Sequence, residues 1–90
     1  MSQTQHLTTL DQMPPQVPAW VSGFARPSDP VLAAQASPVL LRLVEIGFLP
    51  GEPVQVMARG FPMADPLAVR VGHSTFALRA HEAALIEVTW

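Results

Sequence analysis

The sequence predicts a small, mainly β domain, built as a closed or nearly closed barrel of about five short strands with one or two short helices. Short segments in the second half of the chain alternate apolar and polar residues, which is the spacing of half-buried strands. Proline and glycine residues stand between these segments, where tight turns are expected. The clearest helical pattern lies near the middle of the chain. At 90 residues there is room for one domain.

The N-terminal segment, residues 1–18, is mostly polar and contains Pro14, Pro15 and Pro18. We expect it to be a flexible tail that becomes ordered only against something else. The domain is therefore predicted over residues 19–90. Its first strand is expected at Trp20–Phe24, a short aromatic segment that ends before a proline-rich break.

The main helix is predicted between Ser37 and Gly47. Ser37 suits the N-cap, Pro38 suits the first helical position, and Gly47 suits the position just after the last turn. Residues 31–36 are compatible with a helical turn before it, with a kink or boundary at Pro38. Two helical segments, or one kinked helix, therefore remain open.

The two sides of this helix differ in polarity. Leu40, Leu43 and Val44 share one side, so we expect this wide apolar face to pack deeply. Arg42 and Glu45 lie on the other side, three residues apart, and are expected to form an ion pair.

The chain after Gly47 changes from the helical to the strand period. Residues 49–52 fit a type II turn with proline and glycine in the central positions, and residues 54–59 alternate as a strand does. Two more strands, 67–71 and 74–79, flank Gly72-His73, which fits a two-residue type II′ turn. A one-residue slip would destroy the apolar match across this hairpin, so turn and pattern support each other. The matched pairs are Val69 with Phe76 and Leu67 with Leu78.

The last part of the chain contains a short helical turn at 80–84 and a final strand at 85–88. The resulting domain is small, and its core is expected to supply no more than about 3–5 kcal/mol. A partner, or pairing as a homodimer, would help to stabilise it.

The composition argues against several functional classes. Cysteine and tyrosine are absent, there is no nucleophile elbow, and the glycines do not form a phosphate-binding loop, so we do not expect an enzyme. The net charge is −2 and the five basic residues are scattered arginines, which argues against a nucleic-acid partner. No apolar run could span a bilayer and no signal peptide is evident, so we expect a cytoplasmic protein without direct membrane insertion.

The histidines give a weak metal hypothesis. His73 and His81 could join a carboxylate to bind Zn²⁺ or Fe²⁺, within one chain or across two subunits. The carboxylates considered are Glu82, Asp65 and Glu52. The alternative is that the histidines are exposed and share no role, because the spacing of a chelating helix is absent. No cofactor is expected to be required.

A loop between the central strands contains two large apolar residues, Phe61 and Met63, bordered by Pro62 and Pro66. They either cover an open end of the barrel or are exposed for recognition of a partner. Asp65 belongs to the same loop. We therefore take Phe61, Met63 and Asp65 as candidate partner-binding residues.

Several segments match the motifs of one protein family in order and spacing. The segments are Val21-Ser22-Gly23-Phe24, Leu43-Val44-Glu45-Ile46-Gly47-Phe48-Leu49-Pro50-Gly51, Pro62-Met63-Ala64-Asp65-Pro66-Leu67, and Phe76-Ala77-Leu78-Arg79 with Glu82-Ala83 and Ile86-Glu87-Val88. Over residues 19–88 the chain resembles the FeoA family. Two departures stand out: Ala64 replaces a loop glycine of the family, and the segment between Phe24 and Pro38 is longer than usual.

The resemblance implies an SH3-like barrel and a non-enzymatic accessory protein of bacterial ferrous iron uptake. Its implied partner is FeoB, a membrane permease whose cytosolic part carries a GTPase domain, so the chain would lie peripherally at the inner membrane. Transition-metal binding is attributed to such domains in general, and no catalytic residue is transferred. The alternative is a stand-alone metal-responsive module like the C-terminal SH3-like domain of iron-dependent repressors. Whether the protein activates, assembles or inhibits its transporter stays open.

Overall fold

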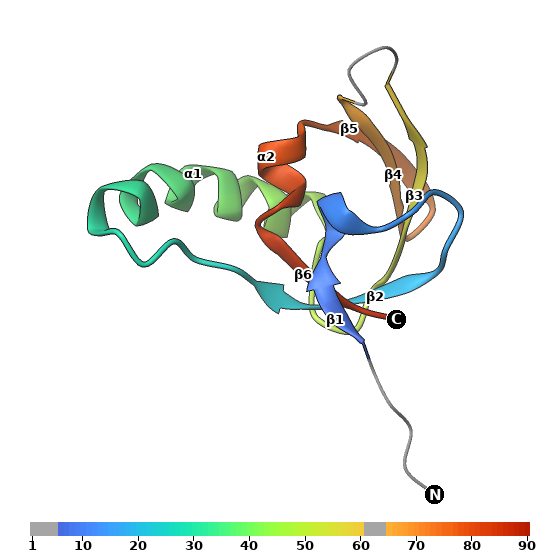
Figure 1. Cartoon of the computed structure of the whole chain (residues 1–90), viewed down its shortest axis with the longest axis horizontal. Coiled ribbons are helices and arrows are strands. Elements are labelled where there is room, and N and C mark those ends of the chain that lie inside the picture. The colour runs from blue at the N-terminus through green and yellow to red at the C-terminus, as the bar shows by residue number, and fades with distance from the viewer. Residues whose placement is uncertain (1–5, 61–64) are drawn as a thin grey trace, which may run out of the picture.

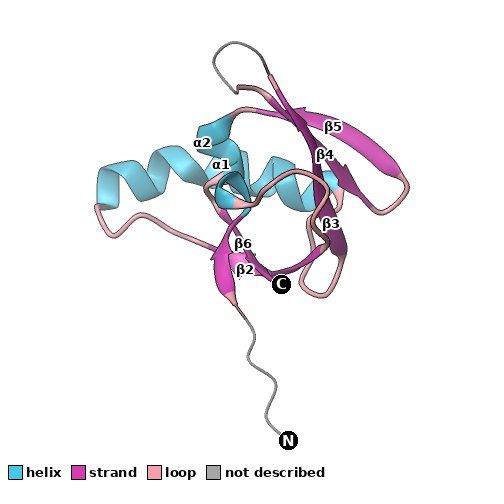
Figure 2. Ribbon diagram, turned by 45° about the vertical axis from the view of Figure 1, so that its right-hand side comes forward, coloured by secondary structure: helices cyan, strands magenta, loops and turns pink. Residues whose placement is uncertain are grey.

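A single curved antiparallel sheet of six strands forms the body of the protein, with strand order β1-β6-β2-β3-β4-β5 (Figures 1 and 2). The structure is a computed structural model, and it describes residues 6–60 and 65–90. The strands are β1 (Leu7–Thr9), β2 (Ala19–Phe24), β3 (Pro53–Arg59), β4 (Leu67–Val71), β5 (Ser74–Leu78) and β6 (Ile86–Thr89). The helices are the 3-10 turn η1 (Leu10–Gln12), α1 (Pro30–Ile46) and α2 (Ala80–Ala83).

The N-terminal segment is part of this barrel from residue 7 onward, which corrects the expected flexible tail over residues 1–18. β1 pairs with β6 and adds a sixth strand to the five that were predicted. In η1 and just after it, Leu10 and Met13 are 0% and 1% exposed. The polar composition of residues 1–18 gave no sign that these two residues are buried. Their burial depends on contacts with β6, which lies far along the chain.

The β4–β5 hairpin has the predicted register. Val69 lies opposite Phe76 and Leu67 opposite Leu78. Gly72 opens the turn with φ of 59°, in the left-handed region that glycine readily adopts. The turn before β3 also agrees with the prediction, because Gly51 has φ of 91°. These local signals therefore suffice to set the β4–β5 hairpin and the turn that leads into β3.

Helix α1 begins at Pro30 rather than at Ser37. The side chain of Asp29 is its N-cap and accepts hydrogen bonds from two N–H groups of the first turn, at 2.8 and 3.2 Å. Pro38 lies inside the helix, and the helix ends at Gly47. The Asp29-Pro30 pair carries the same N-cap and first-position signal as Ser37-Pro38, and it is the earlier pair that starts the helix.

Only part of α1 packs on the barrel. Ala36, Leu40 and Leu43 are its buried residues, whereas Val44, expected on the buried face, is 38% exposed. The N-terminal half of the helix projects away from the sheet (Figure 1). Among the described residues, no helix is long and apolar enough to cross a bilayer.

The core lies inside the curved sheet, where side chains of the strands meet those of α1, α2 and the N-terminal segment. Phe48, which follows α1, is fully buried, as are Ile86 and Val88 on the inner side of β6. The alternation predicted for the last strand is thus confirmed.

Candidate partner-binding site

The base of the loop between β3 and β4 is closed by backbone contacts. Phe61 and Met63 lie outside the described residues, but the residues on both sides of 61–64 are placed. The N–H of Gly60 donates a hydrogen bond to the carbonyl oxygen of Pro66 at 2.8 Å. A Cβ at Gly60 would lie 2.8 Å from the carbonyl oxygen of Asp65, so this approach leaves room only for glycine.

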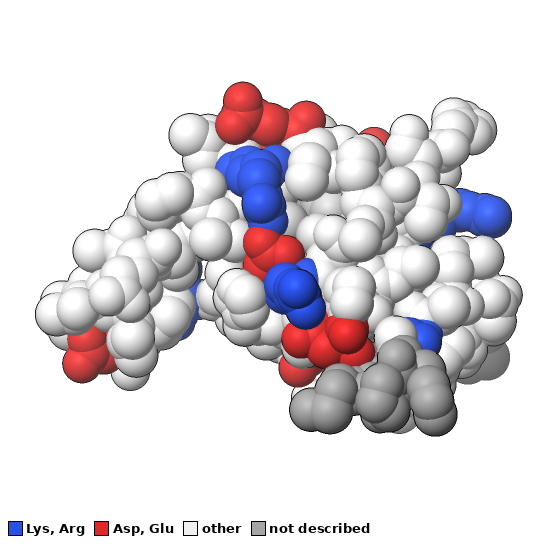
Figure 3. Space-filling model, turned by 90° about the horizontal axis from the view of Figure 1, so that it is seen from above, with Lys and Arg blue, Asp and Glu red and all other residues white. Residues whose placement is uncertain are grey.

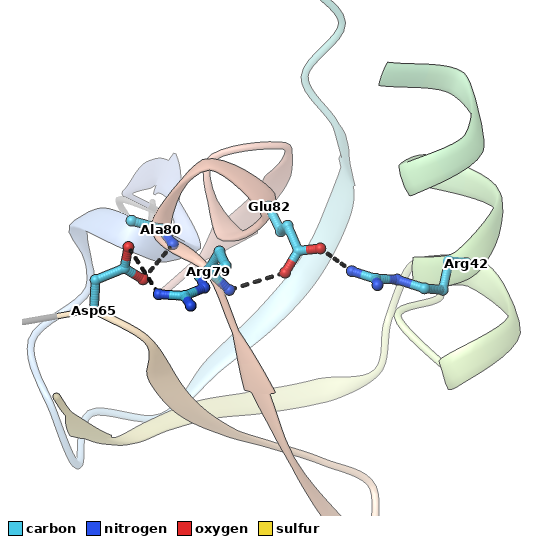
Figure 4. Close-up of polar contacts among 5 residues, drawn as sticks. All are labelled: Arg42, Asp65, Arg79, Ala80 and Glu82. Atoms are coloured by element: carbon cyan, nitrogen blue, oxygen red, sulfur yellow. Dashed lines mark hydrogen bonds and ion pairs between the residues drawn. The ribbon is translucent and has the colours of Figure 1, made fainter. Parts of the chain in front are cut away.

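Asp65 ties this base to the start of α2 (Figure 4). One carboxylate oxygen accepts a hydrogen bond from the Ala80 N–H at 2.9 Å, and the other lies 3.9 Å from the Arg79 guanidinium. The Asp65 side chain is only 33% exposed. Its carboxylate therefore helps to hold the loop base in place, and direct contact of Asp65 with a partner stays a prediction.

Glu82 extends this arrangement to α1. One carboxylate oxygen accepts a hydrogen bond from the backbone N–H of Arg79 at 2.9 Å, and the other forms an ion pair with Arg42. Arg42, Glu82, Arg79 and Asp65 therefore form a polar chain from α1 across α2 to the loop base (Figure 4). We call these four residues the polar chain. The predicted pairing of Arg42 with Glu45 is replaced by this contact between residues 40 positions apart.

A shallow apolar groove of about 200 Å³ lies beside the loop base. It is formed by the ends of β3 and β5 and the start of β4. The lining residues are Ala58, Arg59, Gly60, Pro66, Leu67, Ala68 and Ala77. The candidate partner-binding loop is thus attached at a fixed base, next to an apolar surface that a partner side chain could enter.

The predicted metal ligands are not brought together. His73 and His81 are exposed, whereas Glu82 is buried and engaged with Arg42. In the described part of the chain, no three His, Asp or Glu side chains form a group that could hold a metal ion. The donor set of Glu52, Asp65, His73, His81 and Glu82 therefore does not fit a resident metal site within one chain.

Charged side chains are mixed over the face of the molecule shown in Figure 3. Acidic and basic groups alternate there, and neither sign forms a broad patch. Strong binding to nucleic acid requires a clustered basic surface. This face offers none, in keeping with the scattered arginines of the sequence.

The curved antiparallel sheet with its short helices defines the class of the protein, a small SH3-like barrel. The FeoA domain family matches residues 8–89, and the chain belongs to this family. FeoA proteins are accessory factors of ferrous iron transport and are not a known enzyme family. The match starts within β1 and includes η1, so residues 8–18 are part of the family's domain.

Solved structures of FeoA proteins resemble the chain over most of its length. FeoA from Stenotrophomonas maltophilia, crystallised with zinc, is 34% identical with a TM-score of 0.71, over 90% of this chain and 88% of that one. It is described as a prokaryotic SH3 domain protein and a candidate ferrous iron transport activating factor. Iron(II) transport protein A from Clostridium thermocellum is 31% identical with a TM-score of 0.70, over 90% of this chain and 44% of that one.

A FeoA-like protein from Clostridium acetobutylicum shares the fold at 24% identity, with a TM-score of 0.72 over 91% of this chain and 84% of that one. No curated protein matches the chain. The comparisons confirm the predicted family and the SH3-like class.

Proposed function

We propose that this chain is a non-enzymatic accessory protein of ferrous iron uptake that acts by binding a cytosolic surface of a FeoB-type permease. The observation that carries the proposal is the FeoA family match over residues 8–89. A 34% identical relative, described as a candidate ferrous iron transport activating factor, supports it. On this proposal the protein is cytoplasmic and lies at the inner membrane through its partner.

The docking surface in this proposal is the loop that contains Phe61 and Met63. Its base is held by the Gly60–Pro66 hydrogen bond and by the Asp65 carboxylate. A loop presented on a fixed base loses less conformational entropy when it binds, which favours docking. Phe61 is the expected anchor because aromatic residues dominate the energetics of interfaces.

Substitution of the loop tests this surface. Phe61→Ala should weaken binding to the purified cytosolic part of the permease by about 2 kcal/mol or more, and Met63→Ala by less. The measurements are a pull-down and a cellular iron-uptake assay. Leu7→Ala is the control, because Leu7 is 65% exposed on β1, outside both the loop and residues 25–37.

Circular dichroism should first show that each variant is folded. Folded Phe61→Ala and Met63→Ala variants that bind and support uptake like the wild type would contradict the assignment of this loop. The contact would then have to lie elsewhere, for example on the longer segment of residues 25–37.

We leave a resident metal ion out of this function, because the donor groups of one chain do not converge. The alternative is a metal-responsive module like that of iron-dependent repressors, and the two functions differ in whether binding to the permease requires a metal ion. An accessory protein of transport should bind the permease in the presence of a chelator, whereas a metal-responsive module should require the ion.

A further inference from the structure

Helix α1 carries an apolar strip that the barrel does not cover. Leu41 is 63% and Val44 is 38% exposed, and Ala34 and Ser37 are also exposed. These four residues follow one another at intervals of three, four and three, which is the spacing of a helix-pairing seam. We call Ala34, Ser37, Leu41 and Val44 the seam. We propose that the seam pairs α1 with α1 of a second copy of this chain, in antiparallel orientation.

The sizes of the side chains favour the antiparallel orientation. The N-terminal half of the seam presents the small residues Ala34 and Ser37, and the C-terminal half presents the larger Leu41 and Val44. Antiparallel pairing places Val44 of the second copy on Ala34, and Leu41 of the second copy on Ser37. Each large side chain then meets a small one, whereas parallel pairing would bring large on large and leave a gap between small ones.

The hydroxyl of Ser37 does not oppose burial of the seam. The hydroxyl of Ser37 donates a hydrogen bond to the carbonyl oxygen of Ala33 at 3.2 Å, within the same helix. A hydroxyl that already has a partner can be buried without the cost of an unsatisfied group. Ser37 therefore acts as a small residue on this face.

The charges of α1 agree with the same arrangement. Arg42 and Glu45 are its charged residues, and residues 30–41 carry none. Antiparallel pairing places the charged half of each helix beside the uncharged half of the other, so no like charges face each other. The N-terminal half of α1 also projects beyond the barrel, which lets it lie along the helix of a second copy (Figure 1).

The seam is short, so the pairing should depend on concentration. From Ala34 to Val44 it extends about 15 Å along the helix. Four side chains from each copy bury less surface than the roughly 1,600 Å² of a standard stable interface. We therefore expect a monomer–dimer equilibrium, observable by sedimentation over a concentration series from micromolar to millimolar.

The absence of cysteine allows a direct test of orientation. Ala34→Cys and Val44→Cys proteins are prepared separately and then mixed under mild oxidation. In the antiparallel pair, residue 34 faces residue 44 of the second copy, whereas two copies of residue 34 stay about 15 Å apart. A disulfide needs Cα atoms within about 7 Å. The mixture should therefore form a linked dimer, and neither variant alone should do so.

A second variant tests the seam itself. Leu41→Gln should weaken self-association by at least about tenfold, since each dimer loses two buried leucines. Leu32→Gln is the matched control, because Leu32 is 53% exposed on the same helix but outside the seam.

Disulfide linking by each single cysteine variant alone, or no linking in the mixture, would overturn the antiparallel pair. A chain that stays monomeric at every concentration, yet loses permease binding in Leu41→Gln, would assign the seam to the permease instead.

Discussion

Glu82 shows at the scale of one residue how the sequence's few charges are used. Among the described residues it is the one charged side chain that is buried. Both of its carboxylate oxygens are engaged, by the Arg79 N–H and by the Arg42 guanidinium. The ion pair is partly open to water, because the Arg42 side chain is 54% exposed although that of Glu82 is only 12% exposed.

Truncation of the two partners should therefore have unequal effects. Glu82→Ala should lower the free energy of unfolding by about 1–3 kcal/mol, because it removes the acceptor of the Arg79 N–H as well as the ion pair. Arg42→Ala should cost about 1 kcal/mol or less, since a half-exposed ion pair is screened by water. Urea denaturation followed by tryptophan fluorescence gives both values. An equal or larger loss in Arg42→Ala would contradict this ranking.

At the scale of elements, the N-terminal segment changes the character of the domain. β1 covers the free edge of β6, and η1 places Leu10 in the core. An uncovered edge strand offers unpaired backbone groups to other chains. The segment therefore closes one side of the sheet and fills its interior, a role unlike that of a tail.

Two leucines of this segment provide a matched comparison. Leu10→Ala should lower the free energy of unfolding by about 2–5 kcal/mol, because Leu10 is 0% exposed and its truncation leaves a cavity. Leu7→Ala, at a position that is 65% exposed, should change it by about 0.5 kcal/mol or less. Thermal unfolding by calorimetry measures the difference. Equal stability of the two variants would mean that the segment behaves as a tail after all.

The whole molecule has little stability to spare. A domain of this size is held by one small core, and folded domains generally have a free energy of unfolding of about 5–15 kcal/mol. Among the described residues, most of the buried apolar side chains belong to a single cluster, which includes both strands of the β4–β5 hairpin. Loss of one central side chain should therefore be felt by the entire fold.

Leu78 is such a side chain, at the end of β5 and 1% exposed. Leu78→Ala should cost about 2–5 kcal/mol, a large share of the total. Val31→Ala, at a position that is 64% exposed, is the control. The check is the midpoint of urea denaturation for each variant. A Leu78→Ala protein as stable as the control would exclude Leu78 from the core.

The sequence was sufficient to predict the structure wherever the interactions that decide it are local. The register of the β4–β5 hairpin follows from a two-residue turn and the alternation on either side of it, so Val69 and Phe76 could be paired without a structure. The turn at Gly51 and the inward positions of β6 were predictable for the same reason. The family was also recognisable, because its motifs are short segments in a fixed order.

Only the tertiary structure decided the features that depend on residues far apart in the chain. Asp29-Pro30 and Ser37-Pro38 offer equivalent helix starts, and the sequence could not rank them. The polar N-terminal segment is ordered because β6 and the core accept Leu10. Arg42 pairs with Glu82 rather than with Glu45, since the tertiary fold brings together groups 40 residues apart. The same distance in sequence concealed the anchoring role of Asp65, whose partner Ala80 becomes a neighbour only when the sheet curls on itself.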